Sequence, residues 1–243
     1  MSVMPGKLQV IGVGPGDPEL MTLKAARTIA ASKVIAYFAK RGESGHARRT
    51  ADALICGGTA ELRFEYPFTT DIPVRDPRYR AGIDAFYADC MARIAALLDS
   101  GIDIGLLCEG DPFFYGSSMA LIDRLGMYHI AVIPGISGMS GCWTAAGVSM
   151  THGNDVLTVL PATLEEEVLA AHLLGTDAAV IMKLGRNLSK VRAALQQTGR
   201  LESAVYVERG TMPDERILPM PEFTEEMAPY FALILVPGRQ RWR

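Results

Sequence analysis

The chain has 243 residues, of which 49% are hydrophobic and 21% charged, and its formal charge at pH 7 is −3. This composition is typical of a folded globular protein with one large domain or two small ones, and it excludes disorder as the dominant state. The slight acidic excess argues against nucleic acid as the main partner, because contacts to a phosphate backbone require a basic surface.

Short runs of β-branched residues alternate with segments in which Ala, Leu and Arg recur at helical spacing. The predicted strands are 7–13, 34–38, 103–108, 130–133, 155–160, 178–184, 203–207 and 231–236. The predicted helices are 22–31, 77–98, 117–125, 164–174 and 188–197. This alternation predicts an α/β architecture with much parallel sheet, since crossover helices must cover both faces of such a sheet.

The best-marked helix is 77–98. Asp76 is suited to cap its start, Pro77 suits the first helical position, and Gly101 follows its end. The apolar residues of this segment, Phe86 and Tyr87 among them, recur every three or four positions and form one face. We interpret this face as core and not as a ligand-binding surface.

A domain boundary is predicted near Pro134, where a strand ends and a second α/β series begins. This predicts an N-terminal α/β domain at 1–133 and a C-terminal α/β domain at 134–243, with a cleft between them.

The four cysteines include no CxxC pair, and no Cys/His cluster has the spacing of a metal site. The sequence reaches an apolar strand at once, without a basic leader, and no stretch approaches 18 uninterrupted apolar residues. We therefore expect a cytoplasmic protein with reduced thiols, no metal and no association with a membrane.

Three glycine-bearing loops, at 12–18, 108–116 and 134–141, each leave a predicted strand and enter a helical pattern. The first departs from the dinucleotide-binding fingerprint GxGxxG, because Asp17 occupies its last position. In the second, Asp111 suits either of two roles, accepting from ribose hydroxyls or capping the next helix. Because the loops hold no lysine and no GxxxxGK[ST] motif, they favour a polar organic ligand held by main-chain groups over a triphosphate.

No set of residues of a familiar catalytic type accompanies these loops. The sequence has no GxSxG or HExxH motif, and its four histidines are scattered. A tight turn accounts for any one of the loops nearly as well as a ligand does.

In this order and spacing, the loops GVGPGDPELMTLKA, EGDPFFYG and PGISGMSG resemble the signature loops of the tetrapyrrole (corrin/porphyrin) methylases, which are S-adenosylmethionine-dependent enzymes. The resemblance continues through MKLGRNLSKV, VERGTMPDERI and ALILVPG and covers nearly the whole chain. It implies two α/β domains with the cofactor in the cleft between them, a homodimer, and S-adenosylhomocysteine as the product of the cofactor.

Within the family, the stretches EGDPFFYGSSM, PGISGMSGCWTAAG, DVLTVLP and MKLGRN are most similar to the branch that methylates C(20) of precorrin-2, a metal-free tetrapyrrole, in cobalamin synthesis. The alternatives are the cobalt-containing analogue of this substrate and other members of the family. Members that methylate ribosomal RNA or a protein would favour a basic or protein-docking face, and a non-catalytic nucleotide-binding module is a further rival.

By position, the resemblance implies cofactor contacts at Pro15, Glu109, Gly110, Asp111, Phe114, Tyr115, Ser137, Gly138, Leu184 and Gly210. At Glu109 many relatives carry glycine. No catalytic acid or base is assigned, because a sulfonium methyl is already activated and the enzyme has to orient it.

The implied substrate carries eight carboxylates, and arginine binds carboxylates better than lysine does. The candidate substrate contacts are Gly14, Asp17, Arg48, Arg75 and Arg78. Arg49 and Arg80 lie in the same two arginine-rich segments. For any single arginine, a solvated surface position is an equal alternative.

Overall fold

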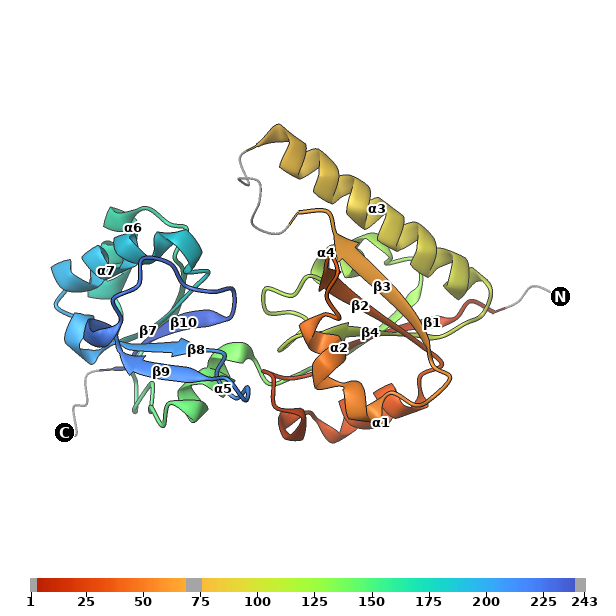
Figure 1. The fold of residues 1–243 in the computed structure, drawn as a ribbon, viewed down its shortest axis with the longest axis horizontal. Helices are drawn as coiled ribbons and strands as arrows, with labels where there is room; N and C mark the ends of the chain where they lie inside the picture. The colour runs from red at the N-terminus through yellow and green to blue at the C-terminus, as the bar shows by residue number, and fades with distance from the viewer. Residues whose placement is uncertain (1–3, 69–75, 239–243) are drawn as a thin grey trace. The chain divides into compact units, whose positions relative to one another are not determined.

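The computed structural model describes residues 4–68 and 76–238, and the chain divides into two compact units, Met1–Gly138 and Met139–Arg243 (Figure 1). Each unit contains a five-stranded sheet with helices, so the predicted α/β fold class is confirmed. No helix in the described part of the chain is both long enough and apolar enough to cross a membrane.

The sheet of the first unit has the strand order β3-β2-β4-β1-β5, and all of its pairings are parallel. Pairing of β1 with β4 sets Gly12 opposite Cys108, and pairing of β1 with β5 sets Ile11 opposite Ile133. The carboxyl ends of three neighbouring strands therefore lie side by side at one edge. The strands are β1 (Lys7–Gly12), β2 (Val34–Lys40), β3 (Ala60–Tyr66), β4 (Ile104–Cys108) and β5 (His129–Ile133).

Helices cover both faces of this sheet, as a parallel sheet requires (Figure 1). Successive strand residues point to opposite faces. Val10 and Leu106 pack with α3 and α4, whereas Ile11 and Leu107 pack with α1 and α2. The helices are α1 (Leu23–Ala31), α2 (His46–Thr50), α3 (Pro77–Asp99) and α4 (Met119–Arg124).

The predicted long helix is confirmed as α3. The carboxylate of Asp76 caps its start by accepting a hydrogen bond from the N–H of Arg78 at 2.9 Å. Gly101, just past its end, has a φ of 76°. Phe86 and Tyr87 pack against the core of the unit, so their interpretation as core residues is also confirmed.

The sheet of the second unit has the order β6-β7-β10-β8-β9 and is mostly antiparallel. Only β6 and β7 pair in parallel among its described strands, because β10 runs against both β7 and β8, and β9 runs against β8. The prediction of parallel sheet is therefore wrong for most of this unit. No crossover helix stands between β8 and β9, so the chain returns beside the strand that it has just left. The strands are β6 (Leu157–Pro161), β7 (Ala178–Met182), β8 (Val205–Glu208), β9 (Arg216–Pro219) and β10 (Ala232–Val236).

The second sheet is also covered on both faces. Ile181 and Ile234 pack with α6 and α7, whereas Val180 and Leu235 pack with α5. The helices are α5 (Gly138–Ala145), α6 (Glu166–Leu174) and α7 (Leu188–Gln197).

Candidate cofactor and substrate site

The three glycine-bearing loops leave the first sheet at the same edge. They comprise residues 109–118, 13–22 and 134–137 and follow β4, β1 and β5, which are neighbours in the sheet. In open α/β sheets, ligands bind at the carboxyl ends of the strands. The fold thus brings together the three segments that the sequence singles out.

The loops after β1 and β4 are joined by hydrogen bonds between their main chains. The N–H of Gly110 donates to the carbonyl oxygen of Gly14 at 2.8 Å, and the N–H of Gly14 donates to the carbonyl oxygen of Gly110 at 3.4 Å. Both glycines have a positive φ, 83° for Gly14 and 62° for Gly110. Residues with a side chain rarely adopt this conformation. This pairing leaves the edge lined by main-chain groups.

The loop after β5 joins this arrangement. A Cβ added to Gly110 would lie 3.4 Å from the nitrogen of Gly138 and 3.8 Å from the Cα of Ser137. Three predicted cofactor contacts therefore adjoin one another, and a fourth, Pro15, is buried next to Gly14.

The two aspartates of the loops bind main-chain N–H groups. Asp111 accepts from the N–H of Phe113 at 2.9 Å and from that of Gly135 at 3.2 Å, so it ties two loops together. Asp17 accepts from the N–H of Glu19 at 2.8 Å. These contacts give both residues a structural role, and their predicted ligand contacts stay predictions. Among the described residues, no three His, Cys, Asp or Glu side chains come together as metal ligands.

Glu109 has a different environment from these aspartates. Its Oε1 accepts a hydrogen bond from the N–H of Ala47, in the first turn of α2, at 3.3 Å. Although part of the residue is exposed, the protein packed around its carboxyl desolvates the charged form and raises its pKa. The hydrogen bond from Ala47 and the positive charge of Arg49 oppose this rise.

Aromatic side chains surround the end of the second loop. The rings of Phe114 and Tyr115 meet edge to face, with centroids 5.0 Å apart. Phe113 is 60% exposed and Tyr115 is 49% exposed. Tyr115 also has a φ of 55°, which is uncommon for a residue with a side chain. This loop thus offers apolar surface to solvent next to main-chain hydrogen-bonding groups.

In the second unit, the candidates Leu184 and Gly210 follow β7 and β8. Because β10 lies between these strands and runs against both, their carboxyl ends share one edge of the sheet. Lys183, Arg209 and Thr211, beside the two candidates, have φ values of 60°, 50° and 70°. Such conformations cost about 1–3 kcal/mol each and cluster at functional sites. Sequence reasoning missed these three residues, since the only nearby signals are Gly185, two positions after Lys183, and Gly210, between Arg209 and Thr211.

At Leu184 and Gly210, a ligand could be contacted only through the main chain. Leu184 is 1% exposed, and its side chain belongs to the core. A Cβ on Gly210 would lie 2.9 Å from the Sγ and 3.0 Å from the Cα of Cys142, so this position has no room for a side chain.

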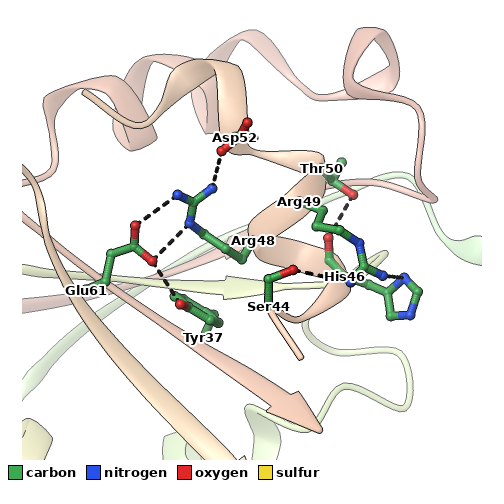
Figure 2. A network of polar contacts seen from close by, with 8 residues as sticks. All are labelled: Tyr37, Ser44, His46, Arg48, Arg49, Thr50, Asp52 and Glu61. Atoms are coloured by element: carbon green, nitrogen blue, oxygen red, sulfur yellow. Dashed lines mark hydrogen bonds and ion pairs between the residues drawn. The ribbon is translucent and has the colours of Figure 1, made fainter. Parts of the chain in front are cut away.

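Arg48 lies in a network of polar contacts (Figure 2). Its Nε and Nη2 donate to the two carboxylate oxygens of Glu61 at 3.0 and 2.9 Å, and its Nη1 donates to Asp52 at 2.5 Å. The hydroxyl of Tyr37 also donates to Glu61, at 2.8 Å. The hydrogen bonds from Arg48 lower the pKa of the Glu61 carboxyl. This pairing joins α2 to β3 and gives Arg48 a structural role, and its predicted contact with substrate stays a prediction.

Arg49 points away from this network (Figure 2). Its Nη1 donates to Ser44 at 3.4 Å, and its Nη2 lies 2.6 Å from the Nδ1 of His46. Because a guanidinium can only donate, this contact requires a neutral His46 with an unprotonated Nδ1. Neither contact is with a carboxylate, although the charge of Arg49 also acts on the carboxyl of Glu109.

The remaining predicted arginines lie near the start of α3. Arg78 is exposed and pairs with Asp76 at 2.7 Å. Arg80 is exposed as well. Arg75 lies outside the described residues.

Comparisons with known proteins bear on what these loops do. The family model of the tetrapyrrole (corrin/porphyrin) methylases matches residues 7–224. The chain is 48% identical over 234 residues to a precorrin-2 C(20)-methyltransferase of Sinorhizobium sp, covering 96% of each chain. It is 27% identical over 239 residues to a cobalt-precorrin-2 C(20)-methyltransferase of Salmonella typhimurium, covering 96% of this chain and 97% of that one.

A solved structure shows the same fold. The uroporphyrin-III C-methyl transferase from Thermus thermophilus, complexed with S-adenyl homocysteine, matches with a TM-score of 0.64 and 21% identity, over 95% of this chain and 97% of that chain. The family match spans all three loops of the first unit and both strand ends of the second. The chain therefore belongs to the tetrapyrrole (corrin/porphyrin) methylases.

Proposed function

We propose that this methylase transfers the methyl group of S-adenosylmethionine to C(20) of precorrin-2, giving precorrin-3A and S-adenosylhomocysteine in cobalamin biosynthesis. The observation that carries the proposal is the 48% identity, over nearly the full length of both chains, to an enzyme named for this reaction. The metal-free substrate is favoured over its cobalt analogue because identity to the enzyme named for the cobalt substrate is 27%.

The loops of the first unit fit a cofactor held through main-chain groups. Gly14 and Gly110 place carbonyl and N–H groups at the carboxyl edge of the sheet without side chains over them. In this proposal Pro15, Gly110, Ser137 and Gly138 contact the cofactor through their main chains. Further contacts come from Glu109, Asp111, Phe114, Tyr115, Leu184 and Gly210.

S-adenosylmethionine supplies a methyl group on a sulfonium, which needs no further activation. The task of the protein is therefore to align the donor with the acceptor carbon and to exclude water. Orientation of this kind contributes about 7–11 kcal/mol of barrier lowering in well-aligned reactions. An edge of glycine main chain suits this task, because it leaves few side-chain rotamers to be ordered on binding.

Arginines bind the carboxylate arms of the substrate in this proposal. Arg49 is the strongest candidate, because its hydrogen bonds go to Ser44 and His46 and not to a carboxylate. Arg78 is a second candidate, and binding there competes with its ion pair to Asp76. Gly14, Asp17 and Arg75 complete the proposed set. We further propose that the enzyme acts in the cytoplasm and that it is a homodimer. Light scattering on the purified protein tests the homodimer.

The test of the function is a methyl-transfer assay with purified protein, precorrin-2 and cofactor carrying a ¹³C-labelled methyl group. We expect one methyl group to be added, with the label at C(20) in the NMR spectrum of the product. Cobalt-loaded precorrin-2 in a parallel reaction should be methylated more slowly. Labelling at another carbon would refute the C(20) assignment, and an absence of heat on titration with S-adenosylhomocysteine would refute cofactor binding.

A further inference from the structure

The loop between β8 and β9, residues 209–215, contains Gly210, one of the proposed cofactor contacts. The main chain is left-handed on both sides of this glycine, with a φ of 50° at Arg209 and of 70° at Thr211. Residues with side chains adopt this conformation only at a cost in free energy, which the surrounding structure has to offset. The contacts that hold the loop therefore matter for the position of Gly210.

Glu208, the last residue of β8, carries a buried carboxylate. Its side chain is 7% exposed and points to the same face of the sheet as that of Tyr206, two positions earlier in the strand. Its Oε2 accepts a hydrogen bond from the hydroxyl of Tyr206 at 2.9 Å, and its Oε1 accepts one from the Nη2 of Arg209. Both carboxylate oxygens thus bind side chains of this protein.

Arg209 extends this anchoring into the loop. Besides the hydrogen bond to Glu208, its Nε lies 3.1 Å from the Oδ2 of Asp214, near the end of the loop. Its main-chain N–H donates to the carbonyl oxygen of Phe231, just before β10, at 2.8 Å. The side chain of Arg209 therefore joins the end of β8 to the far part of the loop, and Gly210 lies in the segment between.

The other face of the sheet limits the position of Gly210 as well. A Cβ on Gly210 would lie 2.9 Å from the Sγ of Cys142, in α5. Cys142 packs with Val207, whose side chain points to the face opposite to that of Glu208. α5 therefore limits the position of Gly210 on one face, while Glu208 anchors the loop on the other.

Stability alone does not account for a carboxylate at position 208. Moving a charge out of water costs about as much free energy as a buried ion pair returns, and apolar residues of similar volume often serve a core equally well. A carboxylate differs from these in fixing the direction of its hydrogen-bond partners. At Glu208 the partner whose direction is fixed is Arg209, at the start of the loop.

We propose that Glu208 is a positioning residue of the cofactor site. Through Arg209 it holds the loop 209–215 in the shape in which the main chain of Gly210 contacts S-adenosylmethionine. This inference rests on the proposed function, because Gly210 is a cofactor contact only in that proposal. Glu208 acts through another residue, so its loss should weaken binding of the cofactor and leave binding of precorrin-2 unchanged.

Glu208→Met tests the proposal, because it keeps an unbranched side chain in the core and removes both acceptor oxygens. Thr198→Val is the matched control. The hydroxyl of Thr198 is also buried in the second unit, and it donates to the carbonyl oxygen of Ala194 at 2.8 Å, at the end of α7 and ahead of β8. Calorimetry with S-adenosylhomocysteine measures affinity, and urea unfolding measures stability. Steady-state kinetics give separate Michaelis constants for S-adenosylmethionine and precorrin-2.

We expect Glu208→Met to weaken the affinity for S-adenosylhomocysteine by about 5- to 100-fold, the range that corresponds to the cost of strained conformations such as that of Arg209. The Michaelis constant for S-adenosylmethionine should rise by a similar factor, and that for precorrin-2 should not change. Glu208→Gln, which keeps an acceptor oxygen for Arg209, should recover most of the affinity. Thr198→Val should lose stability and keep the wild-type affinity.

Arg209→Met should weaken the affinity as Glu208→Met does, because Glu208 acts through Arg209. The double variant should bind no more weakly than either single variant, since both remove the same interaction. Arg209 is partly exposed, so its substitution disturbs the core less than that of Glu208. Arg209→Met therefore decides the question if Glu208→Met does not fold.

Wild-type affinity in folded Glu208→Met or in Arg209→Met would overturn the positioning role and leave the proposed function intact. Additive losses in the double variant would overturn it too. The same holds for an equal loss of affinity in Thr198→Val, since affinity would then follow general stability. Failure of the wild-type protein to bind S-adenosylhomocysteine would instead refute the proposed function.

Discussion

Gly135 approaches Gly110 so closely that a Cβ on Gly135 would lie 2.1 Å from the carbonyl oxygen of Gly110. The two residues belong to different loops, so this contact sets the spacing of the main-chain groups between them. We predict that Gly135→Ala destabilises the protein by about 1–3 kcal/mol, because the loops must separate to admit the methyl group. The variant should also lose affinity for S-adenosylhomocysteine. Urea unfolding and calorimetry measure the two effects.

Gly57→Ala is the control for this substitution. Gly57 is exposed, and a Cβ there would meet nothing within 4 Å. Its unfolding free energy should stay within about 0.5 kcal/mol of that of the wild type, with cofactor affinity unchanged. Equal affinity in the two variants would show that the spacing of the loops does not govern binding.

Arg48→Met should destabilise the first unit by about 1–3 kcal/mol, because it removes the charged hydrogen bonds to Glu61 and Asp52. The Arg48 side chain is 19% exposed, so water replaces these bonds poorly. Lys40→Met, which removes the exposed pair with Glu43, should change stability by less than about 0.5 kcal/mol. Similar urea midpoints for the two variants would contradict a structural role for Arg48.

The ion pair of Glu61 should also make stability depend on pH. Arg48 lowers the pKa of Glu61 in the folded state below the ordinary value of 4.5. The pair therefore contributes stability above pH 4.5, and this contribution is lost as the pH falls through the lowered pKa of the folded state. We expect Glu61→Gln to be less stable than the wild type at pH 7, with a smaller difference at acid pH. A difference that does not vary with pH would rule out this linkage.

Arg49→Met should raise the Michaelis constant for precorrin-2 by roughly 10- to 100-fold, the equivalent of about 1.5–3 kcal/mol for a lost hydrogen bond to a charged group. Affinity for S-adenosylhomocysteine should not change. Arg27→Met, at an exposed position of α1, is the control and should leave both constants as they are. An unaltered Michaelis constant in Arg49→Met would remove Arg49 from the substrate site.

The four thiols should differ in their reaction with iodoacetamide at pH 8. Burial raises the pKa of Cys90 to about 12 and those of Cys108 and Cys142 to about 11, whereas Cys56 is exposed. Because the thiolate is the reactive form, the native protein should be labelled at Cys56 alone, and at all four positions in urea. Mass spectrometry of tryptic peptides measures the labelling of each cysteine. Rapid labelling of Cys108 in the native state would contradict the packing of β4.

The sequence predicted the elements whose apolar residues form a dense block or a helical stripe. It missed β3, in which Leu62, Phe64 and Tyr66 alternate with charged residues, because β3 lies at an edge of its sheet and is only half covered. That omission had a consequence for the site. With no position for Glu61, the partner of Arg48 could not be anticipated, and the predicted contact of Arg48 with substrate stays a prediction.

The loops of the site were easier to predict than the residues that support them. Glycine after a strand marks a place where backbone can approach closely, and a parallel sheet collects such places at one edge. The contact between Glu109 and Ala47 has no comparable signature, because it joins positions 62 residues apart through a short helix. The left-handed conformations of Lys183 and Arg209 likewise have no sequence signature, because they are uncommon for residues with side chains.

The position of β1 in its sheet also affects how the chain matures during synthesis. Both of its neighbours, Ile104–Cys108 and His129–Ile133, lie about a hundred residues further along. A ribosome therefore has to release most of the first unit before β1 can pair at all. Until then the VIG segment of β1 is an unpaired apolar stretch, and nascent chains stalled before residue 104 should be captured by chaperones more readily than those that extend past residue 133.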